Sequence, residues 1–209
     1  MAHRVLLING SPRKNGCTAR ALREIEDTLH AEGIETDLVH IGNADVRGCI
    51  SCRSCYKTGR CVFDDAVNET APLFERADGL IVGSPVYYGS PNGTLLSFLD
   101  RLFYSTQFPK HMKVGAAVVS CRRGGNTASF DVLNKYFTIS AMPVVSSTYW
   151  NQVHGFSASD VEKDLEGLQT MRNLAKNTAF LIRAIAAERE KTGLPAQERS
   201  SFTSFPDGK

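Results

Sequence analysis

The chain has 209 residues, of which 42% are hydrophobic and 22% charged, which is ordinary for a globular protein built around one core. Its net charge of +2, without a long run of Lys or Arg, gives no support to nucleic-acid binding. No stretch approaches the roughly 18 apolar residues of a membrane helix, and the apolar run at residues 5–8 is too short for a signal peptide. We therefore expect a cytoplasmic protein with neither nucleic acid nor a membrane as its partner.

Strand and helix patterns alternate along the chain. Apolar or alternating segments predict parallel strands at residues 5–8, 34–41, 79–83, 114–119 and 144–145. Apolar residues at helical spacing predict helices at residues 18–30, 64–76, 93–104, 127–139 and 161–188. This alternation predicts an α/β fold, a doubly wound three-layer sandwich. We expect one domain over residues 1–190, with a cysteine-rich insertion at about 43–63 and a polar tail at 191–209.

The loop after the first strand, GSPRKNGCT, has the chemistry of a phosphate site. It carries the hydroxyls of Ser11 and Thr18 and the cations of Arg13 and Lys14, and it leads into a helix. The free N–H groups of a helix N-terminus attract anions. The alternative is an ordinary strand–helix turn with an exposed basic pair.

Two more loops follow strands at the same expected edge of the sheet, where ligands of such folds bind. GSPVYYGSPNG, residues 83–93, contains two tyrosines that suit a flat ligand, unless both pack on neighbouring helices. CRRGGN, residues 121–126, has a Gly-Gly pair that lets the backbone approach a ligand closely. Its arginines could meet a negative group, or the loop is simply a solvated turn.

Taken together, GSPRKNG, GSPVYYGSPNGTLLSFLDR and the RRGG loop resemble the flavodoxin-like NADPH-dependent FMN reductase superfamily. The insertion CISCRSCYKTGRCVFDD is similar to the iron–sulfur flavoprotein branch of that superfamily, and the resemblance extends from residue 4 to about 186. It implies a flavodoxin-like five-stranded parallel sheet in the order 2-1-3-4-5, with FMN at the switch point. It also implies an NAD(P)H-dependent FMN or quinone reductase-like oxidoreductase.

The resemblance also assigns roles to residues of the three loops. The residues that would hold the FMN phosphate are Ser11, Arg13, Asn15, Gly16, Cys17 and Thr18. Those that would line the isoalloxazine ring are Pro85, Val86, Tyr87, Tyr88 and Gly89. Those that would lie near its pyrimidine edge are Arg122, Arg123 and Gly124. Cys17 departs from the family pattern, which usually has Asn or Ser there, and its place beside cations at a helix N-terminus predicts a lowered pKa.

Four cysteines, Cys49, Cys52, Cys55 and Cys61, fall in one stretch with the spacing C-x2-C-x2-C-x5-C. In a reducing compartment such a group indicates metal ligands or redox thiols rather than structural disulfides. A single 4Fe-4S cluster is the economical interpretation and matches the iron–sulfur flavoprotein pattern. We expect it near the flavin edge. Zinc and free or oxidised thiols are the alternatives, although zinc sites usually use two separated C-x2-C pairs.

The sequence therefore indicates an FMN-dependent electron-transfer oxidoreductase that uses NAD(P)H or a small redox protein as donor and passes electrons to a small-molecule or protein acceptor. The alternative is a flavodoxin-fold regulatory or binding module without turnover. No acid–base residue is evident, and His154 is the one histidine of interest. Aromatic residues of the kind found at interfaces predict a homodimer or homotetramer; they are Phe103, Tyr104, Phe108, Tyr149 and Trp150.

Overall fold

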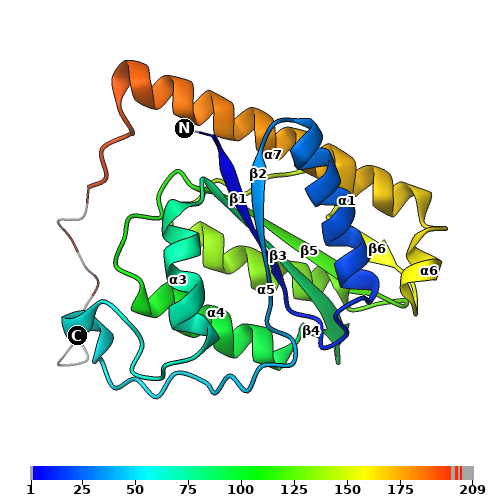
Figure 1. The fold of residues 1–209 in the computed structure, drawn as a ribbon, viewed down its shortest axis with the longest axis horizontal. Coiled ribbons are helices and arrows are strands. Elements are labelled where there is room, and N and C mark those ends of the chain that lie inside the picture. Colours follow the sequence, from blue (N-terminus) through cyan, green and yellow to red (C-terminus); the bar gives the residue numbers. More distant parts are fainter. Residues whose placement is uncertain (1, 199–200, 202, 204–209) are drawn as a thin grey trace.

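The computed structural model describes residues 2–198, 201 and 203. Its centre is a sheet of five parallel strands, in the order β2-β1-β3-β5-β6 (Figure 1). The strands are β1 (Arg4–Asn9), β2 (Glu35–His40), β3 (Gly79–Tyr87), β5 (Val114–Cys121) and β6 (Gln152–His154). Numbered along the parallel sheet alone, this is the expected order 2-1-3-4-5, so the flavodoxin-like fold is confirmed.

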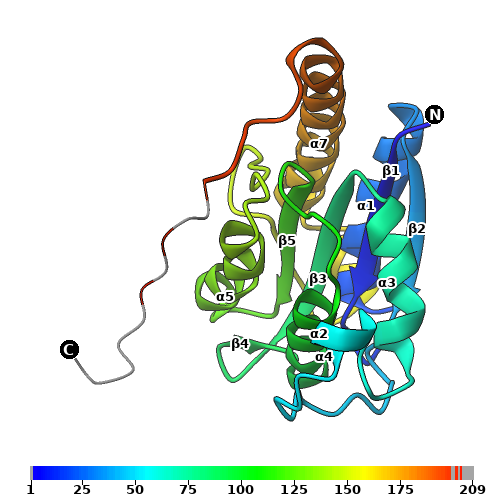
Figure 2. The same ribbon diagram turned by 90° about the vertical axis from the view of Figure 1, so that its left-hand side faces the viewer.

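Helices cover both faces of the sheet (Figure 2). One face packs against α1 (Cys17–Ala31) and α7 (Leu165–Thr192). The other packs against α3 (Ala66–Arg76), α4 (Gly93–Ser105) and α5 (Asn126–Ile139). Alternate residues of β1 enter the two cores, Leu7 one and Leu6 the other, because successive strand side chains point to opposite faces. The strand is therefore continuously apolar, as the sequence predicted.

The fifth strand of the parallel sheet differs from the sequence prediction. Val144 makes only an isolated bridge to Gly115, after which the chain leaves the sheet. It returns as β6, where Gln152–His154 pairs with the end of β5. The segment between contains the exposed rings of Tyr149 and Trp150, which a buried strand would not accommodate.

The long C-terminal helix also begins later than predicted. Asp164 caps it by accepting a hydrogen bond from the backbone N–H of Gly167, and the preceding turn is a separate short helix, α6 (Ala158–Val161). Leu165, expected to face inward, is exposed at this first turn. Helix α7 ends at Thr192, where Gly193 has a φ of +83°. Part of the predicted tail, residues 199–200, 202 and 204–209, lies outside the described residues.

Two short elements lie in loops that the sequence left irregular. A two-residue strand, β4 (Ser90–Pro91), pairs antiparallel with the end of β3. A one-turn helix, α2 (Cys55–Thr58), lies within the cysteine-rich stretch. None of the described helices is both long and apolar enough to cross a membrane.

Candidate functional site

The three loops singled out in the sequence meet at the carboxyl edge of the sheet (Figure 1). The N–H of Gly10 donates to the carbonyl of Gly83 at 2.8 Å, which joins the first loop to the second. The hydroxyls of Thr18 and Ser120 lie 2.8 Å apart and join the start of α1 to β5. These contacts bring together sequence segments about a hundred residues apart.

The first loop is shaped around a helix start that lacks its own cap. Gly16 is the N-cap of α1; no described side chain caps the helix, and its first turn contains no acidic residue. The loop itself is ordered by short bonds, with Asn9 Oδ1 accepting from Ser11 N–H at 3.0 Å and Ser11 Oγ accepting from Arg13 N–H at 3.2 Å. Uncapped N–H groups beside exposed cationic side chains favour a bound phosphate.

The side chains of this loop differ in their exposure to solvent. Arg13, Lys14 and Asn15 are exposed, so their side chains are accessible to a ligand. Thr18 is buried, and its hydroxyl is hydrogen-bonded to that of Ser120. Its backbone belongs to the uncapped first turn of α1. Arg13 also donates to the carbonyl of Phe156, so the loop after β6 belongs to the same site.

Cys17 does not have the lowered pKa that its position predicted. Burial raises the pKa of its thiol and outweighs the lowering effect of a backbone hydrogen bond; the charge of Asp160 also raises the pKa, and that of Arg13 lowers it. The Sγ atom donates to the carbonyl of Gly155 at 3.5 Å. The thiol is therefore a packed, protonated group and not an activated nucleophile.

The second loop presents its aromatic residues to solvent. Tyr88 has a φ of +52° and Gly89 a φ of +74°, which form the tight turn between β3 and β4. This turn leaves the Tyr88 side chain fully exposed and that of Tyr87 45% exposed. Neither ring packs into the core, so the sequence alternative of tyrosines buried against helices does not hold.

The third loop packs directly against the second. Gly125 has a φ of +84°, and a Cβ atom there would lie 2.8 Å from the Cα of Gly89. Only glycine permits both this backbone conformation and this approach. Arg122, Arg123 and Gly124 are exposed beside it.

Some residues of this edge escaped the sequence analysis. Asn92 is buried; its side-chain amide donates to the carbonyl of Gly10 at 2.8 Å, and its Oδ1 caps α4. His40 Nε2 donates to the carbonyl of Ser11 at 2.7 Å. The Asn-Gly pair before the predicted α4 was the available signal for a cap. The contact of His40 had no signal, since it depends on strand pairing. His154, at the end of β6, contacts Asp164.

The four clustered cysteines line one small pocket. Cys49 and Cys52 are exposed at its mouth, Cys55 is buried, and Cys61 is half-buried. Burial raises the pKa of Cys55, and the charges of the three other sulfurs add to this, because all four lie close together. The rest of the lining includes apolar side chains, those of Ile50, Val62 and Phe63.

Four free cysteines around one pocket supply the ligand number of an iron–sulfur cluster. Among the described residues, no group of three or more His, Cys, Asp or Glu side chains is arranged to hold a single metal ion. A zinc ion needs its sulfurs within about 2.3 Å of one point. An iron–sulfur cluster is larger and binds cysteines spread around its surface. All six cysteines of the chain are free thiols, so none of the four is consumed by a disulfide.

Hydrogen-bond donors also point at two of these sulfurs. The backbone N–H of Ser51 donates to Cys49 Sγ at 3.4 Å, with Ser51 held at a φ of +54°. The guanidinium Nε of Arg101 donates to Cys61 Sγ at 3.2 Å. Donors to sulfur are characteristic of cysteines that carry negative charge. The residues present therefore fit an iron–sulfur cluster.

The cysteine pocket lies at one end of α4, and its expected place near the flavin edge stays a prediction. It is lined by Arg101, Tyr104 and Ser105 at the C-terminal end of α4. The second loop, residues 83–93, leads into the N-terminal end of the same helix, at Gly93. Gly93 and Tyr104 are separated by about 16 Å at the usual helical rise.

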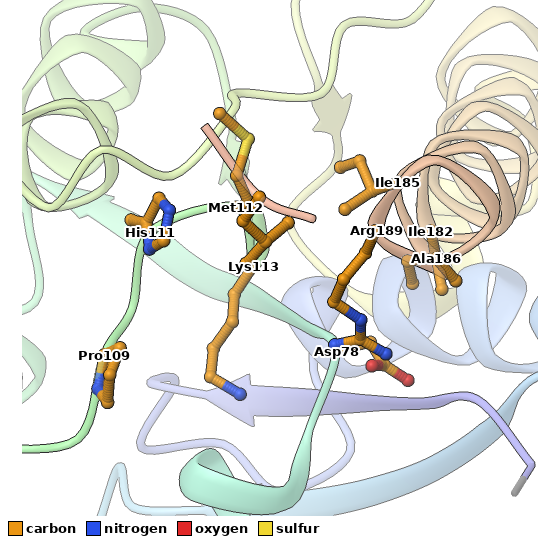
Figure 3. Close-up of a pocket in the computed structure, with 10 residues that line it drawn as sticks. Asp78, Pro109, His111, Met112, Lys113, Ile182, Ile185, Ala186 and Arg189 are labelled. Carbon is orange, nitrogen blue, oxygen red and sulfur yellow. The ribbon is translucent and has the colours of Figure 1, made fainter. Parts of the chain in front are cut away.

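A further cavity lies between α7 and the segment that precedes β5, away from both sites (Figure 3). Lys113 on its wall donates to the backbone carbonyls of Glu75 and Ala77, at the C-terminal end of α3. Burial lowers the pKa of this lysine. The ammonium group of Lys113 therefore serves the end of α3.

Comparisons with known proteins show which family the chain is part of. The family model described as NADPH-dependent FMN reductase matches residues 3–156. An iron-sulfur flavoprotein of Methanocaldococcus jannaschii is 34% identical over 190 residues, covering 87% of this chain and 98% of that protein. One of Methanosarcina thermophila is 32% identical over 188 residues, covering 88% and 97%. A solved archaeal flavodoxin, 15% identical, superposes with a TM-score of 0.58 over 86% of this chain and 99% of its own, which shows the shared fold.

Proposed function

The chain belongs to the NADPH-dependent FMN reductase family of flavoprotein oxidoreductases, and from this we propose that it binds FMN at the three-loop edge and a 4Fe-4S cluster at the four cysteines. It would take electrons from NAD(P)H or a small redox protein and pass them to an acceptor. The observation that carries the proposal is the coexistence, in one chain, of the uncapped α1 start beside exposed tyrosines and the pocket shared by four free cysteines.

The flavin half of the proposal assigns a task to each loop. Bound FMN accepts a hydride and releases its electrons singly or in pairs. The first loop would hold the phosphate with its backbone N–H groups and with Arg13. Tyr87 and Tyr88 would lie along the ring, and Arg122 and Arg123 would stabilise negative charge at its pyrimidine edge. The chain supplies position and charge rather than an acid or base.

The cluster half rests on the ligand set and on the relatives. Both relatives described above are named iron-sulfur flavoproteins. Four cysteines around one pocket match the ligand number of a cubane, which transfers electrons one at a time. Iron and free thiolates also require a reducing compartment, so we propose a cytoplasmic location.

The exposed mouth of the cysteine pocket suits electron exchange with a partner. Cys49 and Cys52 reach the surface there, so a small redox protein could approach the cluster directly. The flavin loops, at the other end of α4, remain open to a small-molecule donor. We propose that the two centres use different partners for this reason.

The test is anaerobic reduction of purified protein by NADPH, followed by flavin absorbance, in wild type and Cys52→Ser. Wild type should be bleached. The variant should lose iron yet retain bound FMN that NADPH still bleaches, because Cys52 lies apart from the flavin loops. Protein that cannot be loaded with FMN would contradict the flavin half, and a variant that keeps the wild-type iron content would contradict the cluster half.

A further inference from the structure

Arg101 is the largest fully buried side chain among the described residues, with 1% of its surface exposed. It lies on α4, on the same inward side as Phe98 and Leu102. A charged side chain is almost never buried this completely unless it is paired. Its burial therefore requires an explanation from its partners.

All five N–H groups of the Arg101 guanidinium are used, and every acceptor belongs to the cysteine-rich stretch or its end. Nε donates to Cys61 Sγ at 3.2 Å. Nη1 donates to Arg47 O at 3.2 Å and Asp65 Oδ2 at 2.7 Å, and Nη2 donates to Phe63 O at 3.3 Å and Asp65 Oδ1 at 2.9 Å. One side chain thus spans residues 47–65, the segment that holds the four cysteines.

The bond to sulfur is separable from the rest of this arrangement. The bidentate pair with Asp65 neutralises the guanidinium and would suffice to anchor the loop. Asn68 anchors the backbone of Cys61 independently, since its side chain bonds both the N–H and the carbonyl of that residue. The backbone at Cys61 is therefore held by Asn68 as well, and anchoring the loop does not require the hydrogen bond from Arg101 Nε to Cys61 Sγ.

We propose that Arg101 is a positioning residue for the iron–sulfur cluster: its Nε–H aims Cys61 Sγ into the pocket and raises the cluster's reduction potential. The inference rests on the cluster of the proposed function. Reduction adds negative charge to the cluster and its sulfurs. A hydrogen-bond donor in a buried site stabilises that charge, and hydrogen bonds to sulfur are an established means of setting cluster potentials.

The experiment measures cluster potential in anaerobically reconstituted protein, by redox titration followed by electron paramagnetic resonance. Arg101→Gln removes both the charge and the Nε donor, and should lower the midpoint potential relative to wild type. Arg101→Lys keeps the charge but lacks the planar fork, and should lower it less. Iron content, FMN content and circular dichroism are measured on the same samples.

Two matched controls separate the sulfur contact from charge and from loop anchoring. Arg47→Gln removes an exposed cation of the same loop whose side chain stacks on Phe63. Asn68→Ala loosens the backbone around Cys61 but leaves the Nε donor. Both should have potentials closer to wild type than Arg101→Gln.

The results decide as follows. A lowered potential in the Arg101 variants, or loss of their iron with FMN and circular dichroism retained, supports the inference when the controls keep both iron and potential. A wild-type potential in Arg101→Gln overturns it, as do equal shifts in the controls. Loss of FMN and helical signal in both Arg101 variants also overturns it, because Arg101 would then be a general clamp of the fold. Wild-type protein without iron would instead contradict the cluster of the proposed function.

Discussion

At the scale of single residues, the position of the first loop depends on a contact that only glycine allows. Gly42, just beyond β2, lies so close to the first loop that a Cβ atom would come within 1.8 Å of the Ser11 carbonyl oxygen. The same carbonyl accepts the hydrogen bond from His40. The backbone after β2 thus packs against the first loop at Ser11 and fixes its position.

Replacing Gly42 with Ala should force these two backbone segments apart. We expect the free energy of unfolding to fall by about 1–3 kcal/mol, the usual cost of overpacking, and FMN affinity to fall with it. Chemical denaturation and flavin fluorescence titration measure both effects. Gly93→Ala is the matched control, because a Cβ at Gly93 meets open space and should change stability by no more than about 0.5 kcal/mol. Equal effects in the two variants would refute the account.

The thiol of Cys17 gives a prediction about pH. Its folded-state pKa is raised above the ordinary value of 9.0, so the folded protein keeps the proton to higher pH than the unfolded chain. The stability from this group is therefore present below pH 9 and is lost as pH rises past the folded pKa. Iodoacetamide should label exposed Cys49 and Cys52 of iron-free protein first, and Cys17 only at higher pH. Fast labelling of Cys17 at pH 7, measured by mass spectrometry, would contradict this.

At the scale of elements, the sequence predicted those units whose signal is local. The run Val5–Ile8 gave β1, and the helical spacing of Leu22, Ile25 and Leu29 gave α1. Strand β6 has three residues, too few for a hydrophobic pattern, and exists because it pairs with β5. The same limit applies to the sites. The three loops were found from their composition, whereas the contact from Arg101 to Cys61 spans 40 residues of sequence and arises only when α4 packs.

The N-cap residue of α3, Asp65, has two roles. Asp65 caps the helix by accepting from Val67 N–H at 3.0 Å, and it pairs with buried Arg101. Asp65→Ala should remove the cap and leave a buried charge unpaired, which lowers the free energy of unfolding by about 3 kcal/mol. Its neighbour Asp64 is exposed, forms an ion pair with exposed Arg60 and accepts a long hydrogen bond from Asn68, so Asp64→Ala should cost about 0.5 kcal/mol or less. Similar losses from both changes in urea denaturation would show that Asp65 has no such role.

At the scale of the whole molecule, the aromatic residues first grouped as interface candidates separate into two kinds. Phe103 and Phe108 pack against Phe74 in the core. Tyr104, Tyr149 and Trp150 remain about half exposed. Tyr88, which was not among these candidates, is fully exposed in the second loop. Exposed aromatics next to an open ligand site favour coverage by a second copy of the chain.

We therefore expect a homodimer or homotetramer in solution. Light scattering after size exclusion should give at least twice the chain mass at micromolar concentration. Trp150→Ser should increase the monomer fraction while leaving circular dichroism unchanged, because the ring is exposed in the single chain. A monomeric wild-type protein under these conditions would contradict the predicted homo-oligomer.

The central claim is that one chain holds two separate redox centres, and the most direct measurement is the flavin and iron content of anaerobically purified protein. The uncapped start of α1 and the four-cysteine pocket share no residue. The account predicts one FMN and about four iron atoms per chain, the cubane stoichiometry, with the visible spectrum of both. Protein that lacks either flavin or iron, and does not accept the missing centre on anaerobic reconstitution, would contradict it.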